Sequence, residues 1–440
     1  MKKLRPFIAV AVVFVVGLVS GWIGVRAFVQ GDTFRQWLSK KISRSLQADG
    51  QFESLAWEGS TFRSPKFSAI GSDRSKLTSL QLTNISAHID WWQLLKWRWV
   101  IDRISADQVD ALIGKKPAKV AAPTTPKQEQ GIKLSNFLPS ELRIEHIYLP
   151  VVNLRWETSH DETGQWVGTT IDAKREGANQ WEVQATGGKV RHATYPELQV
   201  KEGHATVSQN SIVIRNINTQ VKSGGEFWLK GNVATSHSLD ANFGCDFSGV
   251  NVAQTLPNHW YLAGRGTGHI DYVGDLNRFD EGQFTGSLQI ADVTMDLSPL
   301  FRKMQQIIKP SRLNQVRLDS ISVDLDYKNH RGQFLNLKAV YQDQVRLEGS
   351  GSFDPENLAG TIQVGLSPSL LTWLPGSSDQ VFTEDRDGLR WTTAKISGTP
   401  KEPKEDLSKR LLGAFQNKMS QEFKNNVKDA AKTLLDLFQQ

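Results

Sequence analysis

A period-two alternation of apolar and polar residues constrains the fold of this chain more than any other feature. The clearest run is Ile321, Val323, Leu325 and Tyr327. Because successive side chains of a strand point to opposite faces, the pattern predicts sheets with one apolar and one polar face. Short stretches rich in Gly, Asn, Asp and Pro separate the runs, which favours antiparallel hairpins. The same alternation occurs in Leu80 and Leu82; Ile85, Ala87 and Ile89; Leu335, Leu337, Ala339 and Tyr341; Val345 and Leu347; and Ile362, Val364 and Leu366.

The composition is that of a folding chain with no strong charge bias. Hydrophobic residues make up 39% of the 440 residues and charged residues 22%. The net charge of +6 is small against 52 basic and 46 acidic residues, so we expect no nucleic-acid partner. The only cysteine is Cys245, which excludes an intramolecular disulfide.

An uncharged run at residues 7–25 predicts a transmembrane helix. As a helix it would be about 28 Å long, which matches a bilayer core of roughly 30 Å. The alternative is a cleaved signal peptide, but residues 25–27 (VRA) form a poor cleavage site. We therefore expect residues 1–30 to be an uncleaved signal anchor. Basic residues are nearly balanced on its two sides, so the charge count does not settle the topology.

Two segments show helical spacing of their apolar residues. After Asp32, a plausible N-cap, apolar residues recur from Phe34 to Leu46, and Gly50 is a plausible stop. This helix lies on the membrane surface or, the favoured alternative, packs on the following sheet. A second stripe steps by four from Leu411 to Leu435 and predicts a C-terminal amphipathic helix, which caps the sheet or contacts lipid or a partner.

Residues 114–131 contain three prolines and clustered charges without apolar periodicity, which is typical of a flexible linker or long loop. We therefore expect a helix-plus-β unit at residues 31–113, a main antiparallel β region at 132–400 and the terminal helix at 401–440. Short echoes, such as residues 229–231 and 347–349, suggest an internal repeat.

No motif in the sequence indicates catalysis, a cofactor or a metal site. No two of the nine histidines stand four residues apart, and there is no nucleophile elbow. The glycine-rich residues 264–269 are interpreted as a tight turn. Asp324 and Asp326 share one face of a strand, where solvated side chains are the simpler explanation than a hydrolase. We therefore expect that the protein is not an enzyme.

Four tryptophans cluster within residues 91–99, namely Trp91, Trp92, Trp97 and Trp99. Such rings are common at membrane interfaces, and they also cover the ends of sheets. Both interpretations remain open from the sequence.

The order of these features resembles the AsmA-like family, the bacterial relatives of the bridge-like lipid-transfer proteins. The resemblance rests on the signal anchor, the helix at 34–46, residues 50–55 (GQFESL), residues 80–85 (LQLTNI) followed by 92–95 (WQLL) and 101–104 (IDRI), and residues 398–403 (GTPKEP). It implies a mainly β fold with flanking helices, in which an elongated, curved antiparallel sheet forms a groove.

The resemblance also implies a single-pass protein of the bacterial inner membrane with most of its chain in the periplasm. Such a protein would bind or transfer lipids, with phospholipid expected, and support outer-membrane assembly, with other envelope proteins as possible partners. The candidate groove residues are Ile321, Val323, Leu325, Leu335, Leu337, Val345, Leu347, Ile362 and Val364. A membrane-anchored scaffold that contacts protein partners is the second hypothesis, and a carboxylate-dependent hydrolase is the third.

Overall fold

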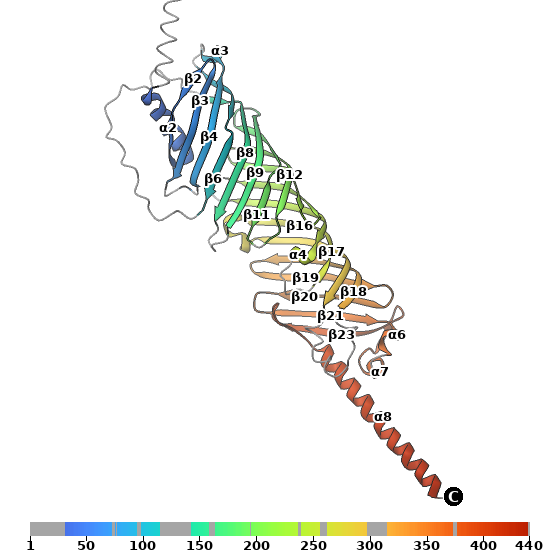
Figure 1. Cartoon of the computed structure of the whole chain (residues 1–440). Coiled ribbons are helices and arrows are strands. Elements are labelled where there is room, and N and C mark those ends of the chain that lie inside the picture. The colour runs from blue at the N-terminus through green and yellow to red at the C-terminus, as the bar shows by residue number, and fades with distance from the viewer. Residues whose placement is uncertain are drawn as a thin grey trace, which may run out of the picture. The chain divides into compact units, whose positions relative to one another are not determined.

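The computed structural model in Figure 1 is mainly β, with 24 strands that pair mostly in the antiparallel sense. It divides into two compact units, the first within residues 1–209 and the second within residues 220–440, and strand β13 (Ser211–Val221) contributes residues to both. The structure describes residues 31–72, 75, 77–94, 98–114, 142–157, 163–193, 195–235, 239–255, 262–296, 315–372 and 376–438.

The described residues of unit 1 form one long helix, one short helix and twelve strands. Its elements are α2 (Asp32–Leu46), β1 (Ala48–Phe52), β2 (Ala56–Glu58), β3 (Thr61–Gly71), β4 (Leu77–Ile89), α3 (Trp91–Leu94), β5 (Trp99–Ser105), β6 (Gln108–Ile113), β7 (Leu142–Ile144), β8 (His146–Glu157), β9 (Thr163–Arg175), β10 (Gln180–Thr186), β11 (Lys189–His192) and β12 (Leu198–Ser208).

The sheet of unit 1 is mixed rather than purely antiparallel. Strand β5 pairs in parallel with β7 and β8, and β6 pairs in parallel with β8, whereas the other described pairs of this unit are antiparallel. Parallel neighbours need a long connection, and the chain between β6 and β7 contains the predicted linker. Residues 115–131 of that linker lie outside the described residues, so its flexibility stays a prediction.

Helix α2 packs on the sheet of unit 1, as the favoured sequence interpretation expected. Phe34 is buried against Trp57, and Ile42 and Leu46 lie against the core around Phe67. The predicted ends were wrong: the N-cap is Gly31 rather than Asp32, and the helix stops at Gln47, whose φ of 51° ends it in the left-handed conformation.

In unit 2 the part of the chain that the structure describes forms eleven strands and several short helices, followed by one long helix. Its elements are β14 (Glu226–Ala234), β15 (Asp240–Asn251), α4 (Val252–Thr255), β16 (Leu262–Asp275), the 3-10 helix η3 (Leu276–Glu281), β17 (Gln283–Asp296), β18 (Gln315–Lys328), β19 (Arg331–Tyr341), β20 (Val345–Phe353), β21 (Leu358–Leu366), α6 (Pro368–Leu371), α7 (Ser377–Gln380), β22 (Glu384–Arg386), β23 (Leu389–Gly398), β24 (Pro403–Glu405) and α8 (Leu407–Phe438).

The strands of unit 2 form an antiparallel meander, as the sequence predicted. Each strand from β14 to β21 pairs with the next, and β23 follows β21 (Figure 1). The turn from β18 to β19 shows why: Asn329 and His330 both have positive φ, at 50° and 61°. A two-residue turn of this kind matches the twist of an antiparallel pair.

The first turns of α8 cap the sheet of unit 2. Leu411 and Ala414 are buried against Leu371 and Phe382, next to Val364 at the end of β21. The side chains beyond Lys424 lie outside the described part of the helix. The structure therefore shows that the first turns of α8 cap the sheet. Whether the later turns contact lipid or a partner stays a prediction.

No helix among the described residues is long and apolar enough to cross a membrane. The predicted anchor at residues 7–25 lies outside these residues, and its insertion stays a prediction.

Candidate functional site: an apolar face on unit 2

One face of the sheet in unit 2 is apolar from β14 to β21. The register aligns Ile290 with Ile321 and with Ala339, and further along it aligns Leu347 with Val364. None of the described positions on this face carries a charged side chain. On strands β17–β21 the apolar face consists of Phe284, Leu288, Ile290, Val293, Leu318, Ile321, Val323, Leu325, Tyr327, Phe334, Leu337, Ala339, Tyr341, Val345, Leu347, Phe353, Leu358, Ile362, Val364 and Leu366, with glycines between them.

All but one of the nine predicted groove residues lie on this apolar face. The exception is Leu335, which pairs with Asp324 on the opposite face and is 40% exposed. Asn336 has a φ of 51° and the register shifts next to it, so a bulge breaks the alternation. Phe334 takes the place on the apolar face that the sequence assigned to Leu335.

Aromatic rings cross this face near one end of the strands. Ring centroids are 6.3 Å apart between Phe243 and Tyr272, 4.9 Å between Tyr272 and Phe284, 6.0 Å between Phe284 and Tyr327, and 6.4 Å between Tyr327 and Phe353. We call these five residues the aromatic row. The aromatic row was not predicted from the sequence, although a glycine on one strand beside an aromatic residue on the next is a pattern that could have indicated it.

The described helices cover only parts of the apolar face. Val252 of α4 packs on Ile290 and Val293, and α6 packs near Leu366. These positions form a packed core. Val323, Leu325 and Ile362 belong to neither packed cluster and are partly exposed. Since apolar surface in water is unfavourable, this part of the face favours an apolar occupant.

Cys245 lies on the same face, opposite Ile270. Burial raises the pKa of the Cys245 thiol, and the neighbouring Asp246 adds to this. A protonated thiol is a small apolar group rather than a nucleophile.

The opposite, polar face carries ordinary surface chemistry. The His269 imidazole lies between two carboxylates, 2.7 Å from Asp246 and 3.0 Å from Asp271. Asp324 accepts a hydrogen bond from Asn336 at 2.8 Å. Among the described residues no group of three or more acidic, His or Cys side chains is placed to hold a metal ion.

Residues 264–269 do not form the tight turn that the sequence suggested. They lie inside strand β16, and their glycines leave room for neighbouring side chains. A Cβ atom on Gly268 would lie 2.7 Å from the Phe247 ring, and one on Gly266 would lie 3.1 Å from Val252.

The tryptophan cluster lies at α3, between β4 and β5 of unit 1. Trp92 is 76% exposed, and its backbone N–H donates to Asp90. Trp97 and the side chains of Trp91 and Trp99 lie outside the described part of the structure. That the four rings meet a membrane interface therefore stays a prediction.

The fold and this face define a mainly β protein with an uncharged sheet surface that runs from β14 to β21. Comparisons with protein families, with curated proteins and with solved structures find no match to this chain.

Proposed function

We propose that the apolar face of unit 2 binds the acyl chains of lipids, in a protein anchored in the bacterial inner membrane. In this proposal the sheet acts as a groove, the protein is not an enzyme, and lipid binding or transfer supports assembly of the envelope. The AsmA-like resemblance of the sequence predicts the same function.

One observation carries the proposal: an uncharged face continues over eight strands, and the described helices cover only parts of it. Each CH₂ group that leaves water contributes about 0.8 kcal/mol, so acyl chains on this surface would be held without any specific polar contact. A polar ligand would leave its hydrogen-bonding groups unpaired there.

A substitution on this face tests the proposal. Val323→Asp places a charge on the partly exposed part of the face, and Ser322→Asp places the same charge on the polar face of the same strand. We expect the full-length Val323→Asp variant to lose most of the lipid that copurifies with the wild-type protein, measured by mass spectrometry after solvent extraction. The Ser322→Asp variant should retain it. Equal lipid content in all three proteins would refute the proposal.

A further inference from the structure

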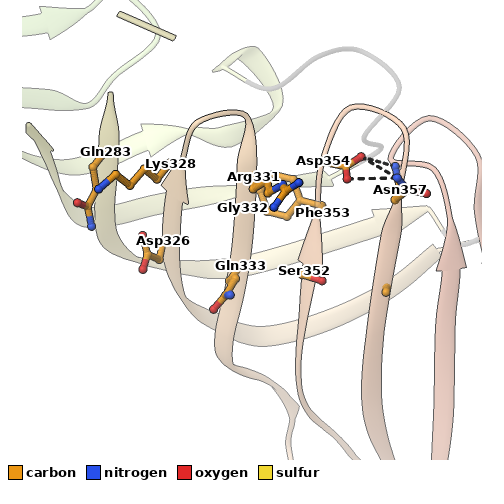
Figure 2. Close-up of a pocket in the computed structure, with 11 residues that line it drawn as sticks. Gln283, Asp326, Lys328, Arg331, Gly332, Gln333, Ser352, Phe353, Asp354 and Asn357 are labelled. Carbon is orange, nitrogen blue, oxygen red and sulfur yellow. Dashed lines mark hydrogen bonds between the residues drawn. The ribbon is translucent and has the colours of Figure 1, made fainter. Parts of the chain in front are cut away.

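A hollow of about 340 Å³ lies at the turn edge of unit 2, where β18 meets β19 and β20 meets β21. Its lining combines both faces of the sheet: Phe353 comes from the apolar face, whereas Lys328 and Gln333 come from the polar face (Figure 2). The hollow therefore adjoins the end of the aromatic row.

Two cations occupy the rim of this hollow. Lys328 and Arg331 are direct register partners across the tight turn, and neither makes an ion pair within 4 Å of a described residue. Like charges placed directly opposite each other on neighbouring strands are destabilising. The Asp354 carboxylate, which also lines the hollow, interacts with Arg331 and offsets part of this repulsion, and a bound anion would offset more of it.

The two acidic residues of the hollow, Asp354 and Asp326, differ in the hydrogen bonds that they accept. Asp354 accepts hydrogen bonds from the backbone N–H groups of Glu356 and Asn357, at 2.8 and 2.7 Å. These bonds, together with the Asn357 side chain, lower the pKa of the Asp354 carboxyl. Asp354 therefore fixes the turn from β20 to β21. Asp326, on the same strand and face as Lys328, has no such bonds.

We propose that this hollow binds the phosphate group of a phospholipid whose acyl chains lie on the apolar face. The inference rests on the proposed function and adds a head-group site to it. Arginine presents paired N–H donors that match phosphate oxygens, and lysine adds a second charge. Asp326 is placed to meet the amine of a zwitterionic head group. Because Gly332 has no side chain, its backbone at the rim of the hollow lies directly against the Phe353 ring.

The test compares two lipids that differ only in the head group. A photo-reactive residue replaces Ile362 on the apolar face of the purified full-length protein, and dioleoylphosphatidylethanolamine or dioleoylglycerol is supplied in detergent micelles. Cross-linked lipid is quantified by mass spectrometry. The double variant Lys328→Gln, Arg331→Gln is compared with a matched control, Arg317→Gln, Lys338→Gln, which removes two cations from the same two strands outside the hollow.

We expect the double variant to lower the yield with the phospholipid about tenfold, since hydrogen bonds to charged groups are individually strong. The yield with dioleoylglycerol should not change, and the control should resemble the parent protein. If the double variant has the same ratio of phospholipid to dioleoylglycerol cross-linking as the parent protein, the head-group site is refuted. A hollow that binds only free phosphate would also leave this ratio unchanged. Absence of cross-linking to either lipid in the parent protein would instead refute the proposed function.

Discussion

At the scale of single residues, the apolar face depends on glycines that leave space for aromatic rings. A Cβ atom on Gly332 would lie 2.2 Å from Cζ of Phe353, and one on Gly351 would lie 2.4 Å from Cζ of Phe334. Neither glycine has a positive φ, so the requirement is steric rather than conformational. The sequence shows these glycines but not which ring lies over each, because that depends on the register between strands.

Gly351→Ala should therefore destabilise unit 2 by about 1–3 kcal/mol, the usual result of overfilling a packed site. Urea denaturation followed by circular dichroism measures the change. Gly413→Ala is the control, because a Cβ atom there meets no other atom within 4 Å. Alanine is also the better helix former, so this control should be neutral or stabilise by up to about 1 kcal/mol. Equal losses in both variants would contradict the steric explanation.

The pair of carboxylates around His269 gives a pH-dependent contribution to stability. The hydrogen bond to Asp246, with the Asp271 carboxylate beside it, raises the pKa of His269 above its ordinary value. Partial burial of the imidazole opposes this effect. A raised folded-state pKa stabilises the fold below the unfolded pKa, and that stabilisation is lost as the pH rises through the folded pKa.

His269→Gln should consequently lower the unfolding midpoint at about pH 5.5 and have almost no effect at about pH 9. The imidazole is 41% exposed, so we expect a small shift. Thermal denaturation of the variant and the wild type at both pH values measures it. A difference of the same size at both pH values would show that the charge on His269 is not its cause.

At the scale of elements, helices and side chains close the outer edges of the strands. On α2, the Ser43 hydroxyl accepts from the Gly50 N–H at 2.9 Å and Ser39 accepts from the Phe52 N–H at 3.2 Å, both on β1. On α8, Arg410 donates to the Thr393 carbonyl of β23 at 2.6 Å. Since an open edge invites pairing with another chain, these bonds keep each unit from extending its sheet.

Ser39→Ala combined with Ser43→Ala should expose the edge of β1. The two amide hydrogens, of Gly50 and Phe52, lose their acceptors, so their hydrogen exchange should accelerate. Mass spectrometry of peptides covering β1 measures this. Ser45→Ala is the control, because the Ser45 hydroxyl donates to the Lys41 carbonyl of the same helix and to no described residue of β1. Slow exchange of both amides in the double variant would show that the hydroxyls do not protect this edge.

Much of the element structure was predictable from the sequence, for a physical reason. Alternation along a strand is a local property, so the strand containing Ile321, Val323 and Leu325 and the helix α2 were identified correctly. The bulge at Asn336 and the parallel pairing of β6 with β8 depend on partners distant in the chain. Local patterns contain no information about such partners, and the misplacement of Leu335 follows from this.

At the scale of the molecule, the proposed function requires that lipid occupies the apolar face. The sequence predicted an apolar strand face but did not distinguish a closed core from an open one, because the alternation is the same in both. The structure shows both conditions on one face: a packed strip at Ile290 and Ala339, and a partly exposed strip at Val323 and Ile362. Only the second strip is available to a ligand.

The most direct measurement is photo-cross-linking in living cells. A photo-reactive residue is placed at Ile362, on the apolar face, or at Gln363, its exposed neighbour on the polar face of β21. We expect lipid adducts on the purified full-length protein at position 362 and none at 363. Adducts at neither position, or protein adducts alone at 362, would contradict lipid binding and favour a scaffold that contacts protein partners.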